Sequence, residues 1–260
     1  MAPFLINRDW HIPQGVRIAF STRRDGVSEF PYKSLNLGLH VGDCEEKVLK
    51  NRALIYERFD LPDFPAWLEQ THSTRVIEAD NKTVHNADGS YSERSKQVCV
   101  VMTADCLPVL LCDRNGSEVA AVHAGWKGLS DGIIEVALDK FKSDKAQLIA
   151  YLGPAISADA FEVGEEVRRM FISQHPTSDI FFIKKEPLAL ISTPGTENSL
   201  VSTEQKYFAD LQGLAKFRLN LAGVSEVYLA DTCTFKNADD YFSYRRDQIT
   251  GRMASFIWLA

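Results

Sequence analysis

Two histidines and one cysteine lie at the ends of apolar runs in this sequence. They are His72 in WLEQTHSTRV, Cys106 in TADCLP and His123 in AAVHAGWKG. Side chains at the ends of buried strands can converge, and two imidazoles with one thiolate are a ligand set for zinc, and also for copper. Three protein ligands leave a fourth position open, where bound water with a pKa of about 7 can become a hydroxide.

The spacing of these residues leaves two other interpretations open. They lie 34 and 17 positions apart, and the chain has no C-x-x-C or H-E-x-x-H motif. Without such a signature, all three can be hydrogen-bonded polar residues at strand ends. Cys106 can also be a nucleophile whose thiolate is activated by His123. Cys99 and Cys112, in contrast, lie inside apolar runs and are expected in the core.

Composition excludes several classes of protein. Of the 260 residues, 45% are hydrophobic and 25% are charged, which is typical of a soluble globular protein. The net charge of −6 argues against a nucleic-acid partner, although a local group of cations could still bind a small anion. No apolar run reaches the roughly 18 to 20 residues of a membrane helix, so no membrane partner is expected.

The cysteines and the first residues of the chain indicate where the protein works. The five cysteines are odd in number and sparse, which argues against a disulfide scaffold. The first fifteen residues, MAPFLINRDWHIPQG, do not resemble a secretory signal. We therefore expect a cytoplasmic protein with reduced thiols. No coiled-coil seam favours an assembly, so a monomer is expected.

Helix and strand patterns alternate along the chain and predict an α+β fold in a single domain, residues 1–260. Short apolar runs predict strands at 16–21, 98–103, 108–112, 118–123, 148–152, 226–230 and 254–259. Apolar residues at helical spacing predict helices at 46–59, 133–141 and 164–174. Ser202 with Gln205 fits a capping box that opens a further helix ending at Gly223. The polar stretches 83–97 and 193–199 are expected to be loops.

Six segments give the chain a resemblance to the YfiH-type family, labelled variously as a laccase-domain or polyphenol oxidase family and as purine nucleoside phosphorylases. They are STRRDGVSEFPYKSLNLGLHVGD (21–43), WLEQTHS (67–73), TADCLPVLLCD (103–113), AAVHAGWKG (120–128), LGPAISADAFEVGEEV (152–167) and FSYRRDQITGRMAS (242–255). These segments follow one another in order nearly from end to end. The resemblance implies an α-β-β-α layered sandwich and a metal held by His72, Cys106 and His123.

The same resemblance implies a catalytic role for His72, Cys106 and His123 in purine nucleoside chemistry. It implies phosphorolysis of adenosine, inosine and methylthioadenosine, with adenosine deamination beside it, and zinc as the cofactor, with copper possible. Arg24, Lys127 and Arg245 lie in matched segments and are candidates for phosphate contact. Each of these cations can instead form a surface salt bridge or be a solvated charge.

Several other residues in the matched segments have two interpretations. Asp105 is a candidate proton carrier for deamination, but it can also be a turn or cap aspartate. Trp126, Phe242 and Tyr244 can stack on a purine or pack in the core. The chain departs from the family pattern at Ser73 and Gln248, where glycine is usual, and at Lys127, where arginine is usual. A lysine binds phosphate as a point charge and lacks the fork of arginine.

Three functions from other classes remain as alternatives. A multicopper oxidase needs many histidines, commonly in H-x-H pairs, whereas this chain has six histidines and no such pair. Copper at a single site could still oxidise phenols as a side activity, the copper-dependent polyphenol oxidase alternative. A Cys106–His123 pair could instead hydrolyse amide bonds, for example those of cell-wall precursors. Finally, the metal could be structural in a protein without catalysis.

Overall fold

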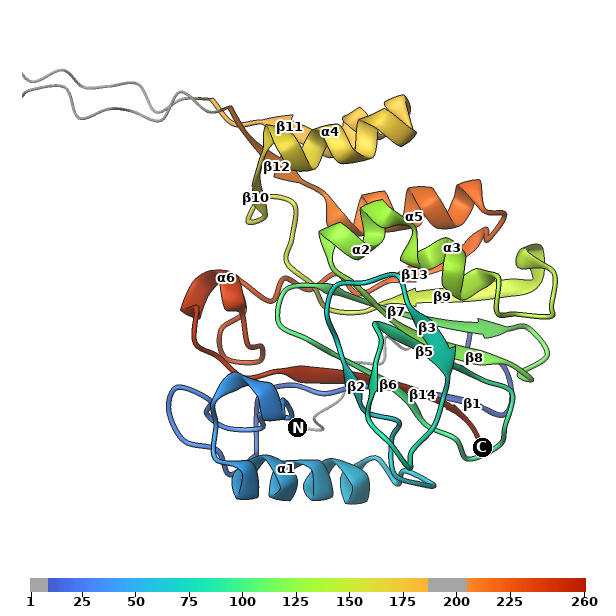
Figure 1. The fold of residues 1–260 in the computed structure, drawn as a ribbon, viewed down its shortest axis with the longest axis vertical. Coiled ribbons are helices and arrows are strands. Elements are labelled where there is room, and N and C mark those ends of the chain that lie inside the picture. Colours follow the sequence, from blue (N-terminus) through green and yellow to red (C-terminus); the bar gives the residue numbers. More distant parts are fainter. Residues whose placement is uncertain (1–8, 187–204) are drawn as a thin grey trace, which may run out of the picture.

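Two β-sheets packed face to face form the centre of the protein (Figure 1). The computed structural model describes residues 9–186 and 205–260. One sheet has six strands in the order β13-β9-β7-β8-β5-β3, and the other has three in the order β1-β14-β6. The six strands are β3 (Val76–Glu78), β5 (Gly89–Ser92), β7 (Leu107–Asp113), β8 (Val119–Ala124), β9 (Leu148–Leu152) and β13 (Glu226–Leu229). The three strands are β1 (Val16–Phe20), β6 (Cys99–Thr103) and β14 (Met253–Leu259).

Helices cover the outer face of each sheet, so the layers follow the order α-β-β-α (Figure 1). On the three-stranded sheet lies α1 (Glu45–Arg58). On the six-stranded sheet lie α2 (Trp126–Asp131), α3 (Ile133–Leu138) and α5 (Leu211–Leu221). The α+β class and the layered sandwich are confirmed. Within the described residues, every helix is too short or too polar to cross a bilayer.

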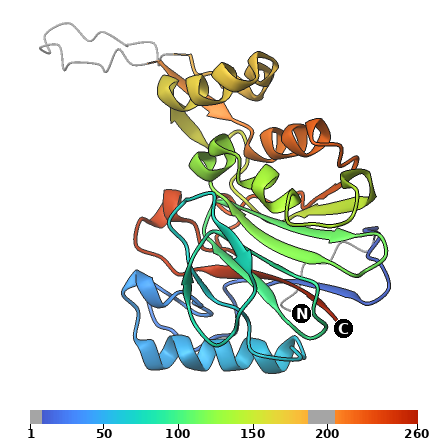
Figure 2. The ribbon, with the colours of Figure 1, turned by 45° about the vertical axis from the view of Figure 1, so that its right-hand side comes forward.

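A third, smaller sheet stands beyond α2 and α5 (Figure 2). It consists of β10 (Glu162–Gly164), β12 (Lys206–Ala209) and β11 (Phe182–Lys184), with α4 (Glu165–Gln174) packed against it. The remaining elements are short: β2 (Leu68–Glu69), β4 (His85–Asn86), α6 (Tyr244–Asp247), η1 (Leu39–Val41), η2 (Lys145–Gln147) and η3 (Pro176–Phe181). The loops that carry η1, β2 and α6 contribute residues to the cavity described below.

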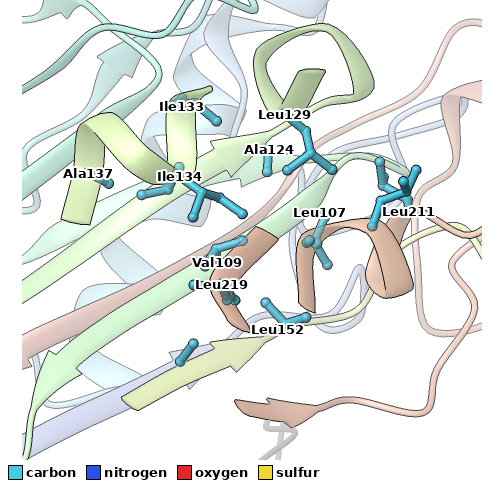
Figure 3. Close-up of a cluster of buried hydrophobic side chains, with 14 of the residues drawn as sticks. Leu107, Val109, Ala124, Leu129, Ile133, Ile134, Ala137, Leu152, Leu211 and Leu219 are labelled. Carbon is cyan, nitrogen blue, oxygen red and sulfur yellow. The ribbon is translucent and has the colours of Figure 1, made fainter. Parts of the chain in front are cut away.

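Strand β7 illustrates how the sequence builds two cores at once. Leu107, Val109 and Leu111 face the helices, whereas Leu110 and Cys112 face the three-stranded sheet. Alternate side chains of a strand point to opposite faces, and both faces of this strand are covered. The strand is therefore a continuous apolar run. Figure 3 shows side chains of the first core, where β7 and β9 meet α3 and α5.

The hairpin of β7 and β8 brings two of the predicted metal ligands together. Pro108 pairs with His123 in its register, so Cys106 precedes β7 close to the end of β8 where His123 lies. Asp113 fixes the turn between the strands, because its carboxylate accepts hydrogen bonds from main-chain N–H groups of Ser117 and Glu118 at 2.6 and 2.8 Å. The register of the hairpin follows from this turn.

Two predictions about secondary structure are wrong. Residues 83–97 are not a loop, because they contain β4 and the fully buried strand β5. Gln205 does not belong to the first turn of a helix, since β12 follows it and α5 begins after Asp210, which caps the N–H of Gly213 at 2.8 Å. Ser202 and the predicted loop 193–199 lie outside the described residues. The predicted end of this helix is confirmed by Gly223, which has a φ of 99°.

Candidate metal centre

His72, Cys106 and His123 come together at one point of the fold. Their possible ligand atoms all lie within 4.8 Å of one another, and Cys106 Sγ is 3.8 Å from His72 Nε2. The three residues come from the loop after β2, the residue before β7 and the end of β8. His123 is buried, Cys106 is half-buried and His72 is exposed, so the cluster is open to solvent on one side.

Gly125 allows the three side chains to approach this closely. A Cβ at this position would lie 2.7 Å from Cδ2 of His72 and 3.2 Å from Sγ of Cys106. The first distance is too short for two carbon atoms in contact, so any larger residue would push His72 away from the cluster. Gly125, the glycine of the HAGW segment, is therefore required for the geometry of the site.

Asp88 holds both histidines from behind. It is fully buried between β4 and β5, and its Oδ1 accepts hydrogen bonds from the main-chain N–H of His72 at 2.9 Å and from Nδ1 of His123 at 2.8 Å. Its Oδ2 accepts from the N–H of Thr71 and from both the N–H and the hydroxyl of Ser73. One carboxylate thus receives five hydrogen bonds and fixes the loop 71–73 against β8.

This anchoring explains two details of the loop. His72 adopts a φ of 59°, a left-handed conformation that is rare for a residue with a side chain. The three consecutive N–H groups that point at Asp88 hold it there. The hydroxyl of Ser73 adds a bond of 2.7 Å to Asp88, which a glycine, the residue that the resemblance implies here, cannot make.

Charge in the cluster favours an ionised Asp88. Burial on its own would raise the pKa of this carboxyl, but the hydrogen bonds from His123 and Ser73 and the charge of His123 lower it to about 2. Asp88 is therefore a carboxylate at any physiological pH. It also fixes the proton of His123 on Nδ1 and leaves Nε2 as the atom that can bind a metal.

Cys106 and His123 form a charged pair in the protein without metal. Burial alone would raise the pKa of Cys106, but the charge of His123 and hydrogen bonds from both histidines lower it to about 6. Burial alone would lower the pKa of His123, yet Cys106 and Asp88 raise it to about 9. At neutral pH Cys106 is a thiolate, which is the form that binds metal or attacks an electrophile.

The cluster fits a tetrahedral ion such as zinc or copper. Ligands at 2.0 to 2.3 Å from such an ion would lie about 3.3 to 3.6 Å from one another. The observed spacing, with one pair at 3.8 Å and all within 4.8 Å, requires movements of about 1 Å or less from each side chain. No other group of three histidine, cysteine or acidic ligands gathers within residues 9–186 and 205–260.

A cavity of about 540 Å³ opens above the three ligands. Of the residues singled out in the sequence, Asp105, Trp126, Tyr244 and Arg245 line it beside the ligands. The lining also contains His40, Gln70, Ile156, Phe161 and Arg252. This size is within the range of pockets that hold small ligands.

Arg24 and Lys127 do not line this cavity. Arg24 forms an ion pair with Asp240, and Lys127 forms one with Asp131 at 2.6 Å, one turn further along α2. Both cations are exposed, as their alternative interpretation stated. Phe242 is fully buried beneath the guanidinium of Arg23, which lies 4.5 Å from its ring centroid. Phe242 is therefore a core residue.

Asp105 serves as an anchor for a distant segment. Its carboxylate accepts hydrogen bonds from the hydroxyls of Thr234 and Ser243 at 2.7 and 2.9 Å and from the N–H of Arg245 at 2.7 Å. These bonds fasten the chain around α6 to the residue next to Cys106. Since the oxygens are occupied in this way, the turn-aspartate interpretation describes Asp105 better than that of a proton carrier.

Sequence reasoning missed three residues of the site. Asp88 lies in NADG, inside the stretch expected to be a loop, where an aspartate before glycine is an ordinary turn signal. His40 and Arg252 lie in the matched segments 21–43 and 242–255, but the spacing gave no sign that these segments meet. The one available signal for Asp88 was its position directly before a strand that pairs with β8.

Comparisons with known proteins show the family. The curated purine nucleoside phosphorylase YfiH of Shigella flexneri is 44% identical over 257 residues, covering 98% of each chain. A purine nucleoside phosphorylase of Haemophilus influenzae is 44% identical over 254 residues, covering 97% of this chain and 98% of the relative. The crystal structure of a Neisseria meningitidis protein has a TM-score of 0.87 at 44% identity, covering 99% of both chains. The family pattern itself matches residues 17–260, and the chain belongs to the family described as multi-copper polyphenol oxidoreductase laccase.

Proposed function

We propose that this protein is a purine nucleoside phosphorylase that acts on adenosine, inosine and methylthioadenosine with phosphate. The observation that carries the proposal is the cavity of about 540 Å³ above His72, Cys106 and His123, which joins metal ligands, aromatic rings and cations. The names of the curated relatives in Shigella flexneri and Haemophilus influenzae support it. Together they favour a nucleoside and an anion as the two substrates.

The reaction balances as a transfer of the ribosyl group. An oxygen of phosphate forms a bond to C1′ of the ribose, and the N-glycosidic bond breaks. The bonding electron pair leaves with the purine, which takes up a proton. The products are the free base with ribose 1-phosphate from adenosine and inosine, and with 5-methylthioribose 1-phosphate from methylthioadenosine. A bound metal supplies a Lewis acid that stabilises developing negative charge. His72, Cys106 and His123 would hold it, with Asp88 orienting both histidines.

The remaining lining residues bind and orient the substrates in this proposal. Trp126 and Tyr244 offer aromatic faces for a purine, and Ile156 and Phe161 add apolar surface that excludes water. Arg245 donates from Nη1 to the carbonyl of Glu162 at 2.7 Å, which holds its guanidinium at the cavity. Pre-organised groups of this kind lower the entropic cost of aligning two substrates.

Adenosine deamination is proposed as a side activity of the same site. In this reaction the oxygen of water bonds to C6 of the purine and ammonia leaves, which gives inosine. The carboxylate of Asp105 is occupied by Thr234, Ser243 and Arg245, so the proton must move through another group or through solvent. We therefore expect deamination to be slower than phosphorolysis.

One observation favours a second candidate function. The Cys106 thiolate, with its pKa lowered to about 6 beside His123, is suited to nucleophilic attack on an amide, as in a hydrolase of cell-wall precursors. Phenol oxidation by bound copper is a further alternative. All six histidines lie in the described residues, where one ligand cluster forms, and this supports a single metal ion.

Product analysis tests the proposal. Protein of known zinc and copper content is incubated with adenosine and phosphate, and the products are separated by chromatography. Adenine with ribose 1-phosphate is the expected result, and Cys106→Ala should abolish it. The exposed Cys44, at the start of α1, offers the matched control Cys44→Ala, which should retain full activity. Failure to form adenine with any metal, or unchanged activity in Cys106→Ala, would overturn the proposal.

A further inference from the structure

The cavity carries more positive than negative charge. Among the described residues that line it, Arg245 and Arg252 are guanidinium groups and Asp105 is the one carboxylate. That carboxylate already accepts hydrogen bonds from Thr234, Ser243 and the N–H of Arg245. A divalent ion would add two positive charges, of which the Cys106 thiolate offsets one. The cavity of this acidic protein is therefore suited to an anion.

Arg245 is exposed, and its guanidinium makes one hydrogen bond and one ring contact with the described residues. Its Nη1 donates to the carbonyl oxygen of Glu162 at 2.7 Å, and its guanidinium carbon lies 5.3 Å from the ring centroid of Phe161. Its main-chain N–H is bound to Asp105. These contacts favour a role for Arg245 in holding the apolar part of the lining together.

Arg252, in contrast to the exposed Arg245, is half-buried in the lining of the cavity, and its head group also retains unused donors. Nη1 donates to the carbonyl oxygens of Thr250 and Gly251, both at 3.1 Å, whereas Nε and Nη2 make no hydrogen bond with the described residues. The base of the side chain is fixed. Its main-chain N–H donates to Asn36 at 2.9 Å, and an added Cβ on Gly38 would lie 2.9 Å from Cγ of Arg252. Arg252 therefore presents free N–H groups from a rigid stem.

His40 lies beside Arg252 in the same lining. Burial, followed by the charges of Arg252 and Arg52, lowers the pKa of His40. The imidazole is consequently neutral at pH 7 and can donate one N–H to an anion without adding a competing charge. Two segments far apart in the sequence, 21–43 and 242–255, thus bring a guanidinium and an imidazole to one place.

We propose that Arg252, with His40 beside it, forms the subsite that binds the phosphate co-substrate. A guanidinium fork matches two oxygens of a tetrahedral oxyanion, and a neutral imidazole supplies a further donor. This assignment rests on the proposed phosphorolysis, and it places phosphate on Arg252 and not on Arg24 or Lys127. The same chemistry would also bind the phosphate group of a nucleotide, so the experiment separates these two sources.

The test compares variants of the metal-loaded protein. Calorimetry measures the dissociation constants of inorganic phosphate and of adenosine monophosphate, and kinetics measure KM for phosphate and for adenosine. Arg252→Gln should weaken phosphate in both measurements by about 10- to 100-fold, because a charged hydrogen-bond donor is lost. Arg252→Lys keeps the charge without the fork and should weaken it about five- to tenfold, and His40→Ala about two- to tenfold. Arg17 is an exposed arginine outside the cavity that donates only to a backbone carbonyl, so Arg17→Gln is the control.

The outcomes distinguish this subsite from the proposed function. Arg252-dependent phosphate binding without ribose 1-phosphate formation would retain the subsite and refute phosphorolysis. Ribose 1-phosphate formation with an unchanged phosphate KM in Arg252→Lys and His40→Ala would refute the subsite and retain the function. A larger effect of Lys127→Gln or Arg24→Gln than of the Arg252 variants would also refute it. If Arg252→Gln weakens the nucleotide and leaves inorganic phosphate unchanged, the anion is part of a nucleotide and the proposal is wrong.

Discussion

Replacement of Asp88 by asparagine removes one acceptor and adds one donor at the centre of the candidate metal site. The carboxylate accepts five hydrogen bonds on two oxygens. If the amide nitrogen faces the loop, it opposes the N–H groups of Thr71 and Ser73. If the amide nitrogen faces the histidines, it cannot accept the hydrogen bond from the N–H of His72. It can donate to Nδ1 of His123 only when the proton of that ring moves to Nε2, the metal-binding atom.

Both orientations have a cost that can be estimated. Each lost hydrogen bond to a buried charge costs about 1.5 to 3 kcal/mol, and two are lost in either orientation. We therefore expect Asp88→Asn to lower the free energy of unfolding by about 3 to 6 kcal/mol. We also expect metal affinity to fall about 10- to 100-fold, since the partners of ligating histidines set the tautomer and the orientation of the ring.

The assay pairs two measurements on two variants. Urea denaturation of the metal-free protein gives the free energy of unfolding, and titration against a chromophoric chelator gives zinc affinity. Asp113 is the matched control, because it is also fully buried and also accepts several N–H groups, but in the β7–β8 turn. Asp113→Asn should lose similar stability and keep its zinc affinity. If Asp88→Asn binds zinc as tightly as Asp113→Asn does, Asp88 does not orient the ligands and the reasoning fails.

Three further predictions concern residues around the same cluster. The pKa of Cys106 is lowered from its ordinary value to about 6. Its thiolate therefore stabilises the fold above the ordinary pKa, and this contribution is lost as pH falls through 6. The thiolate absorbance of the metal-free protein should vanish near pH 6, and bound metal should block alkylation of Cys106 at pH 7. Persistence of alkylation with saturating metal would instead support a nucleophile. Gly125→Ala should abolish zinc binding when a competing chelator limits the free zinc, because the added Cβ collides with His72. The circular dichroism spectrum should stay unchanged. Normal zinc affinity in this variant would contradict the packing argument. Asp105→Ala should lower the free energy of unfolding, measured in urea, by about 2 to 4 kcal/mol, and Asp105→Asn by about 1, since an amide can still pair with Thr234 and Arg245. An unchanged free energy of unfolding in Asp105→Ala would show that the carboxylate is no anchor.

The sequence predicts the elements whose pattern matches their environment. Strand β7 is an apolar run because both of its faces are covered, and α1 has apolar residues at helical spacing with polar residues between them. Strand β5 was missed because its residues are Gly89, Ser90, Tyr91 and Ser92, which are small or polar although they are buried. Its small side chains allow it to pack beside β8, and a hydrophobicity pattern does not reveal packing of this kind.

The residues of the candidate site were likewise predicted in part and missed in part. The types of His72, Cys106 and His123 allow metal binding but also strand-end polar roles or a nucleophile pair, and the family resemblance selects the metal site. The structure brings the three together as a possible ligand set. Arg252 and His40 could not be selected over Arg24 and Lys127, because all four are cations or imidazoles in matched segments. Which of these four side chains is available to bind phosphate depends on which of them form ion pairs with acidic residues. Arg24 and Lys127 do, with Asp240 and Asp131, and only the folded chain decides this.

The three candidate ligands are not all local in the sequence, and this affects how the protein folds. Cys106 and His123 lie at the two ends of the β7–β8 hairpin, whereas His72 lies on the separate loop 71–73, so the complete ligand set forms only when this loop has docked beside the hairpin. Binding of this kind stabilises the native state after the folding barrier has been crossed. Metal at 100 times its dissociation constant would add about 2.7 kcal/mol, which corresponds to unfolding that is roughly a hundredfold slower, with the rate of folding unchanged. Metal bound at this candidate site would therefore stabilise the finished fold and prolong the lifetime of the native protein.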